Sequence, residues 1–238
     1  MKKNCVKVFF SGMILLALSL VFSACHKVSP EEIEKQTNLL FDAIADNDAD
    51  KIKLCVKSGA DINRNKDGKG TPLIYAVKNT RVKLETAELL LSLKADVNGK
   101  DSLEMSAIHH AVPRGETFLD LLVKAGADIN AKDKMGRTPL VFANDPNMYS
   151  TNFCINNAKA LLARGADINA LDNAGYSVLM NALKNRNTES DYINFLISSG
   201  AKLDVRAQDG STALSIVKDD WLGPRYDILT LLTAWGAK

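Results

Sequence analysis

Two short motifs recur along the chain, and this recurrence constrains the fold more than any other feature of the sequence. A loop spelled GADIN occurs at 59–63, 126–130 and 165–169. Related loops place an Ala after successive intervals of 35, 32, 39, 35 and 36 residues, at Ala60, Ala95, Ala127, Ala166, Ala201 and Ala237. A nearly fixed period of this kind indicates a stack of similar units, each of which needs its neighbours to bury its apolar face.

A hydroxyl residue opens the second motif and keeps a constant distance from the first. It lies eight residues after the last residue of each loop, at Thr71, Ser106, Thr138, Ser177 and Thr212. Ser and Thr accept a hydrogen bond from a free N–H at the start of a helix, so we expect a helix to begin at each position. Pro72 and Pro139 suit the first helical residue, where a missing N–H has no cost.

An apolar segment precedes each loop and is expected to form the second helix of each unit. The Gly of the loop then supplies the left-handed residue that ends this helix. Lys94 replaces that Gly in the second unit, at about 1 kcal/mol of local strain. The residue four places before the Gly position is always apolar and is predicted to face the next unit: Cys55, Leu90, Leu122, Leu161, Leu196 and Leu232.

The helix starts "GTPLIYAV" at 70–77, "MSAIHHAV" at 105–112 and "RTPLVFA" at 137–143, together with the loops, resemble the ankyrin repeat. The resemblance covers residues 29–238. It implies a mainly α solenoid of about six helix-turn-helix repeats linked by β-hairpin-like fingers, with the first and last repeats as caps. The predicted repeats are 29–67, 68–102, 103–134, 135–173, 174–208 and 209–238.

The length of the repeat varies only in the segment from the hydroxyl residue to the following loop, which is the helix pair and its connecting turn. This variation is expected on the side away from the fingers. The largest insertion surrounds residues 144–153, where Pro146 is expected to stop the first helix of the fourth repeat. We interpret the insertion as a longer outer loop. The alternative is a second contact surface.

Residues 1–24 have the features of a bacterial secretory signal. Lys2, Lys3 and Lys7 precede an almost wholly apolar run at 8–22, which small residues follow. This run is shorter than the roughly 20 residues of a membrane-spanning helix. We therefore exclude the signal from the fold and predict an exported protein.

The end of the signal, "FSAC" at 22–25, resembles the lipobox of bacterial lipoproteins, although Phe22 replaces the usual Leu. The resemblance implies that Cys25 carries acyl chains that anchor the protein to an envelope membrane. Residues 25–28 are then a short tether, and Ser29 with Glu32 forms a capping box at the first helix. The alternative is an ordinary cut nearby, which leaves Cys25 a spare thiol on a soluble periplasmic or secreted protein.

Charge excludes one class of partner. Removal of residues 1–24 takes away three of the 30 basic residues and none of the 28 acidic ones, which leaves a net charge of −1. This balance argues against nucleic acid as the ligand. No motif for a cofactor or a small-molecule substrate is evident either.

The search for reactive groups favours structural roles. Cys55 and Cys154 are expected roughly 30 Å apart, which is too far for a disulfide. The resemblance places the His109 ring inward, against backbone of the neighbouring loop. His110 lies on the concave side with no Cys, His or carboxylate at ligand spacing, so we predict no metal site and no enzyme.

Ankyrin-like stacks usually bind partners on the fingers and on the concave face of the first helices. The varying residues of the three central fingers are predicted to form a binding stripe of apolar, aromatic and Arg side chains, the mixture enriched at interface cores: Leu103, Met105, Met135, Arg137 and Tyr176. Tyr75, His110 and Phe142 could extend this stripe onto the concave face. The alternative is that Leu103 and Met105 pack finger on finger.

These observations predict a non-catalytic protein-binding module, anchored in a bacterial envelope, that binds, scaffolds or inhibits another envelope protein. Two alternatives stay open. The first is an enzyme, or an accessory part of one, with a site near His110 and the finger acids Asp101, Glu104 and Asp133. The second is a structural spacer between envelope layers.

Overall fold

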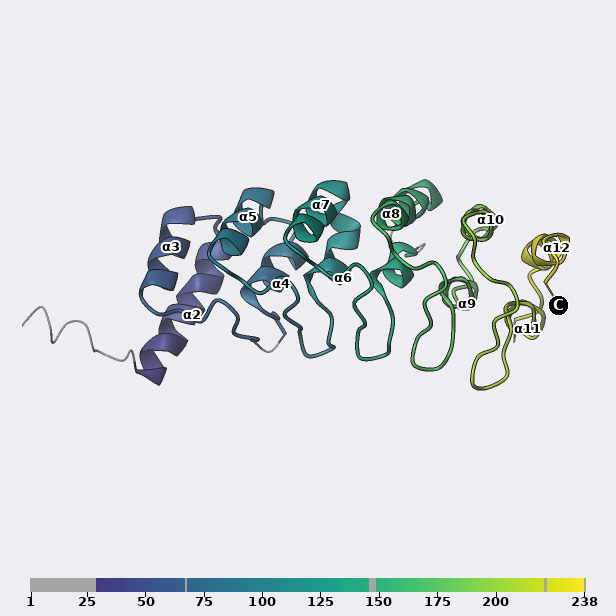
Figure 1. Ribbon diagram of the computed structural model, residues 1–238, viewed down its shortest axis with the longest axis horizontal. Helices are drawn as coiled ribbons and strands as arrows, with labels where there is room; N and C mark the ends of the chain where they lie inside the picture. The colour runs from purple at the N-terminus through teal and green to yellow at the C-terminus, as the bar shows by residue number, and fades with distance from the viewer. Residues whose placement is uncertain (1–28, 67, 146–148, 221, 238) are drawn as a thin grey trace, which may run out of the picture.

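The protein is a solenoid built from two rows of helices and one row of fingers (Figure 1). The computed structural model describes residues 29–66, 68–145, 149–220 and 222–237. In chain order its helices are α2 (Pro30–Ala45), α3 (Ala49–Lys57), α4 (Pro72–Lys78), α5 (Leu84–Ser92), α6 (Ala107–Ala111), α7 (Glu116–Lys124), α8 (Thr151–Ala163), α9 (Val178–Lys184), α10 (Ser190–Ser198), α11 (Ala213–Lys218) and α12 (Tyr226–Ala234). Two 3₁₀ segments, η2 (Val112–Arg114) and η3 (Pro139–Ala143), complete the set.

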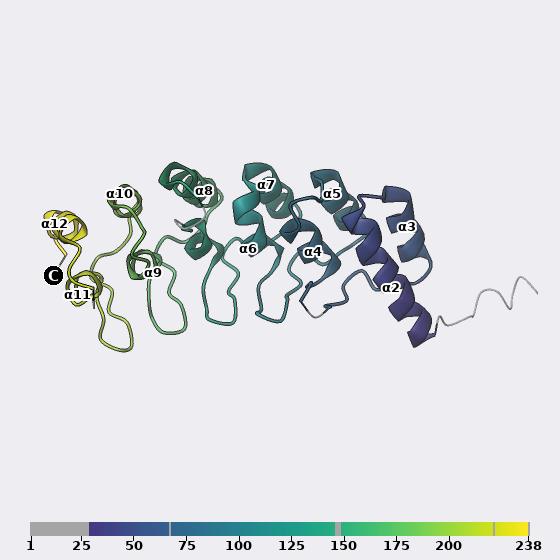
Figure 2. The same cartoon turned by 180° about the vertical axis from the view of Figure 1, so that it is seen from behind.

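Successive helices along the chain lie in turn in the inner and the outer row, as both views show (Figure 2). The inner row, next to the fingers, contains α2, α4, α6, η3, α9 and α11, and the outer row contains α3, α5, α7, α8, α10 and α12. The fingers are residues 64–70, 99–105, 131–137, 170–176 and 205–211. Isolated antiparallel bridges close four of them at the base, for example Lys100 with Ser106. The predicted solenoid with hairpin-like fingers is confirmed.

Hydroxyl side chains begin the inner helices at most of the predicted positions. Thr71, Ser177 and Thr212 each accept a hydrogen bond from the backbone N–H three residues later, at 3.2 to 3.3 Å. Ser29 does the same for α2 at 3.2 Å. The Glu32 side chain instead accepts from Gln36, so only half of the predicted capping box forms.

The fourth repeat departs from this pattern. Its inner segment is the 3₁₀ helix η3 rather than an α-helix, and the Thr138 hydroxyl is buried without a hydrogen-bond partner. The reason is local: the Val141 N–H, which the hydroxyl should cap, donates to the Thr138 backbone carbonyl at 3.0 Å. The prediction of a capped α-helix is therefore wrong at this repeat.

The loop glycines adopt the left-handed conformation that was predicted for them. Gly59, Gly126 and Gly165 have φ angles of 98°, 91° and 89°. Lys94 takes the same place in the second repeat with φ of 71°, which confirms the strained substitution. The turn therefore adopts the left-handed backbone conformation at this position even when the residue is not Gly.

One apolar column runs through the centre of the solenoid. The residue four places before each loop glycine position is buried, from Cys55 at one end to Leu232 at the other. All of these residues except Cys55 are fully inaccessible to solvent. These side chains belong to a single core that extends over all repeats. The prediction that this column faces the neighbouring repeat is confirmed.

The Asn that ends most of these loops gives one reason for their similarity. Asn63 of the first loop accepts from the Asp96 N–H at 2.8 Å. Asn130 donates from its side chain to the Gly165 carbonyl at 3.2 Å and accepts from the Asp167 N–H at 2.8 Å. Asn98 and Asn169 make the equivalent pair of bonds to the next repeat. One side chain thus satisfies a carbonyl and an N–H of the following loop, and a ladder of amides joins successive repeats.

Replacement of Asn130 by Ala should lower the free energy of unfolding by about 1–2 kcal/mol, because two hydrogen bonds between repeats are lost. Urea unfolding followed by circular dichroism measures this change. Asn156→Ala is the matched control, since Asn156 is exposed on α8 and should change stability by only about 0.5 kcal/mol or less. Equal midpoints for the two variants would count against the ladder.

The last repeat ends the stack with polar side chains. In internal repeats, positions three and six after the hydroxyl residue are mostly apolar, as in Met180 and Leu183, which are buried. In the last repeat Ser215 and Lys218 occupy these positions, and Thr233 replaces the buried Ile197 of the outer helix. A polar outer face is what a terminal repeat requires.

Several predictions concern residues outside the described ranges. These are the signal at 1–24, the lipidated Cys25, the tether at 26–28 and the helix stop at Pro146. Within the ranges that the structure describes, no helix has both the length and the apolar character needed to cross a bilayer.

Candidate functional site

Backbone hydrogen bonds join the tips of neighbouring fingers. The Lys134 N–H donates to the Leu103 carbonyl at 2.9 Å, and the Asn173 N–H donates to Met135 at the same distance. The Gln208 N–H donates to Ala174 at 3.0 Å. The four fingers from 99–105 to 205–211 are therefore held side by side, and they present their tips as one row.

An Asp at the start of each of the three central fingers shapes the finger from inside. One carboxylate oxygen of Asp133 accepts two backbone N–H groups of its own finger, from Met135 at 2.9 Å and Arg137 at 2.8 Å. Asp101 and Asp172 accept the equivalent pairs. The sequence contains a signal for this role, since an Asp lies five residues before the hydroxyl residue in three successive repeats.

The second carboxylate oxygen of each Asp binds a donor on the inner side of the solenoid. These donors are His110 at 3.0 Å from Asp101, Arg137 at 2.7 Å from Asp133, and Asn181 at 3.0 Å from Asp172. The finger is thereby joined to the inner helix through His110 and Asn181, whereas Arg137 braces its own finger. Sequence reasoning missed Asn181 as a member of this set.

No carboxylate stands at ligand spacing from His110 in the sequence, but the finger folds back and brings Asp101, one of the finger acids of the enzyme alternative, to it. Both side chains are largely buried. Burial lowers the pKa of His110 below its usual value, and the hydrogen bond to Asp101 offsets part of this effect. The imidazole is consequently uncharged near neutral pH and serves as a donor to Asp101.

The predicted binding stripe is divided between surface and core. Leu103 and Met135 are 58% and 61% exposed on the tips of adjacent fingers, whereas Met105 and Tyr176 are only 8% and 9% exposed. Arg137 is half-buried between the two groups. The predicted stripe is therefore not exposed along its whole length. Met105 packs inside the stack, as the alternative interpretation required, whereas Leu103, to which the alternative also applied, is exposed.

Tyr176 is buried because its ring and hydroxyl are both occupied. The hydroxyl donates to the Asp209 carboxylate of the next finger, which lowers the pKa of Asp209 to about 2. The Lys184 ammonium lies 3.7 Å from the centre of the ring. Tyr176 thus supports the surface without contributing much area to it.

The three aromatic or imidazole residues proposed for the concave face are half-buried. The Phe142 ring stands edge-on to His109 at 5.7 Å, and the Arg137 guanidinium lies over it at 4.7 Å. Tyr75 stands edge-on to Phe41 at 5.4 Å, two repeats away along the stack. Phe142 and His110 are near one another, whereas Tyr75 is a separate contact point.

Three hollows of about 230, 300 and 330 Å³ follow one another along the inner row. Phe142 and Asp145 line the first two, and Arg137 and Asn181 line the last two. Because neighbouring hollows share these lining residues, we call the series the inner groove. The residues that define it are Lys78, His110, Arg137, Phe142, Asp145, Tyr149, Asn181 and Lys184.

The inner groove differs from an enclosed ligand pocket. Each hollow is at or below the lower end of the volumes that small-molecule sites usually have, about 300–1,000 Å³. Its walls combine aromatic rings, Asn side chains and Arg137, with an exposed lysine at each end. An open series of shallow hollows with this chemistry suits the surface of another protein.

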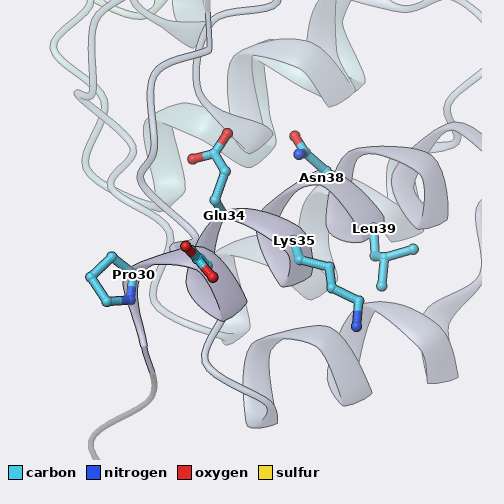
Figure 3. A pocket seen from close by; sticks show the side chains of 6 residues that line it. Pro30, Glu34, Lys35, Asn38 and Leu39 are labelled. Carbon is cyan, nitrogen blue, oxygen red and sulfur yellow. The ribbon is translucent and has the colours of Figure 1, made fainter.

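A further hollow lies at the start of the solenoid, away from the inner groove. Residues of α2 line it, and Glu34 and Asn38 project from one side of the helix while Lys35 and Leu39 project from the other (Figure 3). Glu34 pairs with Arg64 of the first finger at 3.2 Å. The first half of α2 is thus in contact with the finger row.

The remaining candidate groups for chemistry are occupied in the fold. Cys55 and Cys154 are free and buried, and burial raises the pKa of both thiols. The His109 ring is buried and faces the Arg137 carbonyl at 3.3 Å, as predicted. Across the described part of the chain, no three His, Cys, Asp or Glu side chains are grouped to hold a metal ion.

Comparison with known proteins agrees with this architecture. The family described as "Ankyrin repeats (3 copies)" matches residues 3–101. An ankyrin repeat domain from Acinetobacter baumannii AYE superposes with a TM-score of 0.65 at 27% identity, over 84% of this chain and 98% of that one. The chain belongs to the ankyrin-repeat family. The ankyrin domain of Bcl-3 is also similar, with a TM-score of 0.68, 26% identity and coverage of 84% and 86%.

Curated relatives of this ankyrin-repeat protein are longer than it is. Ankyrin repeat and SOCS box protein 6 of Pongo abelii is 30% identical over 178 residues, which is 67% of this chain and 42% of that protein. Human Rabankyrin-5 is 30% identical over 215 residues, which is 84% of this chain and 18% of Rabankyrin-5. Ankyrin repeats are in general non-catalytic modules that mediate binding between proteins.

Proposed function

We propose that this chain is a non-catalytic protein-binding module, anchored in a bacterial envelope membrane as a lipoprotein, that holds, scaffolds or inhibits another envelope protein. The observation that carries the binding part is the inner groove. It is a long, open depression with aromatic, Arg and Asn walls, on a scaffold whose fingers are locked by buried carboxylates.

Arg137 is the central contact of the proposed site. Its guanidinium is held by the buried Asp133 and lies over Phe142, so it is preorganised and loses little entropy on binding. Arg and aromatic side chains in such settings carry much of the energy at protein interfaces. His110 and Phe142 belong to the same surface, and Met135 reaches its rim.

The proposed roles of the other predicted residues follow from their positions. Met105 and Tyr176 shape the groove from within, and Tyr75 offers a separate contact on the second repeat. Leu103 lies on a fingertip outside the groove. Anchoring is supported by the signal and by the lipobox-like sequence that ends at Cys25.

Charge reversal at the two ends of the groove tests the binding site. Lys78 and Lys184 are exposed, and a partner that fills the groove contacts both. We expect Lys78→Glu with Lys184→Glu to reduce capture of the partner from detergent-solubilised membranes by about tenfold or more, because the partner then meets like charge. Cross-linking before solubilisation, followed by mass spectrometry, measures the capture.

The matched control changes two exposed lysines outside the groove, Lys124→Glu with Lys202→Glu, and keeps the same net charge. It should capture the partner as the wild type does. Equal loss in both double variants would point to general charge rather than to the groove. Full capture by the groove variant would refute the proposed site.

A further inference from the structure

We infer that the solenoid stands with its finger edge against the lipid bilayer, and that Leu103 and Met135 enter the headgroup layer. This inference rests on the proposed lipid anchor and adds an orientation and a lipid contact to it. It assigns to lipid two fingertip side chains, of which Met135 also reaches the rim of the inner groove.

The first helix begins at the same edge of the molecule as the fingertips. In both views the first turn of α2 extends down to the level of the finger row, while α3 and the other outer helices lie at the opposite edge (Figure 1, Figure 2). The contact of Glu34 with Arg64 fixes the start of α2 beside the first finger. The Lys66 ammonium, which hydrogen-bonds Asn38, strengthens this contact.

The length of chain between the anchor and α2 then places the bilayer. Four residues, 26–29, separate Cys25 from Pro30, and four residues span at most about 14 Å. A membrane that holds the acyl chains on Cys25 is therefore within about 14 Å of Ser29. Because α2 begins at the level of the finger row, a bilayer that lies along the finger edge is within reach of this tether.

Two large apolar side chains stand on this edge. Leu103 and Met135 are more than half exposed on adjacent fingers, and the bond from the Lys134 N–H to the Leu103 carbonyl holds the two tips together. A lone exposed apolar residue needs no explanation, but a fixed pair at an edge beside a membrane anchor is suited to the headgroup boundary.

The exposed charged side chains of these two fingers are Lys100, Glu104, Lys132 and Lys134, and Glu104 pairs with Lys100 at 3.7 Å. The two fingers therefore carry more exposed positive than negative charge. Attraction to anionic lipid should consequently add to apolar burial at this contact.

Site-specific fluorescence quenching tests the orientation on the full lipidated chain. Leu103→Cys and Met135→Cys each provide one accessible thiol for a bimane label, since Cys55 and Cys154 are buried. Leu54→Cys on α3, in the outer row, is the matched control because Leu54 is 61% exposed. The proteins are reconstituted into phosphatidylethanolamine and phosphatidylglycerol vesicles that carry brominated acyl chains.

We expect at least about twofold stronger quenching at 103 and 135 than at 54, because bromine quenches at short range and apolar groups at the interface reach only about 5–10 Å into the lipid. Quenching should weaken when the phosphatidylglycerol content is lowered, because the two fingers carry a net positive exposed charge. Equal or absent quenching at all three sites in protein that floats with the vesicles would overturn the orientation and leave the anchor intact. Protein that does not float would overturn both. If a cross-linked protein covers the labelled fingertips and shields them from the quencher, Leu103 and Met135 belong to a protein interface instead.

Discussion

Replacement of Cys25 by Ala is expected to move the protein from the membrane fraction to the soluble fraction and to abolish incorporation of labelled fatty acid. The reason is that each buried methylene contributes about 0.8 kcal/mol, so several acyl chains make a durable anchor whereas a chain without them has none. In the described ranges, no helix is long and apolar enough to cross a membrane. Fractionation of cells grown with labelled palmitate measures both effects.

Cys5→Ala is the matched control for this experiment, because Cys5 lies in the proposed signal and would be removed with it. That variant should remain lipidated and bound to the membrane. If Cys25→Ala stays fully in the membrane fraction, the lipid anchor proposed here is excluded. If neither variant nor the wild type incorporates label, the ordinary signal-peptide interpretation is the correct one.

Replacement of Leu122 by Ala should lower the free energy of unfolding by about 3–4 kcal/mol. Leu122 is fully buried in the central apolar column, and truncation there combines the lost transfer free energy with a cavity that neighbouring repeats cannot easily fill. Urea unfolding, followed by circular dichroism, should show a large decrease in the midpoint. Because each repeat depends on its neighbours, the loss extends beyond the third repeat.

The control for the core prediction is Leu54→Ala, which removes the same atoms from an exposed position on α3. Its stability should stay within about 0.5 kcal/mol of the wild type. A change below about 1 kcal/mol for Leu122→Ala would show that the column does not hold the repeats together.

Several parts of the architecture could be predicted because they depend on residues close in sequence. A hydroxyl residue caps a helix through the N–H three residues later, and a Gly ends a helix through its own φ angle. These local requirements recur with the period of the repeat, so helix starts, loop turns and the buried column followed from spacing alone. Even Lys94, where the expected Gly is absent, adopts the predicted left-handed conformation.

The binding surface could be predicted only in part, because exposure in a finger depends on the next finger. Leu103 and Met105 are two residues apart, yet the first is on the surface and the second is in the core. Likewise, Tyr176 is covered through Asp209, which lies 33 residues away. Spacing within one repeat contains no information about such contacts.

Local motifs and their spacing were thus enough to predict a stack of ankyrin repeats with fingers of constant length. The same sequence identified residues 1–25 as the part to test for export and anchoring. The positions of the finger residues, on the surface or in the core, could be read only from the folded chain. The same holds for the bond between His110 and Asp101 and for the Arg114 side chain, which donates to the Val77 carbonyl at 2.9 Å. The structure also showed that Thr138 caps no helix. The physical reason is that motifs encode local backbone geometry, whereas burial and side-chain pairing arise from contacts between repeats.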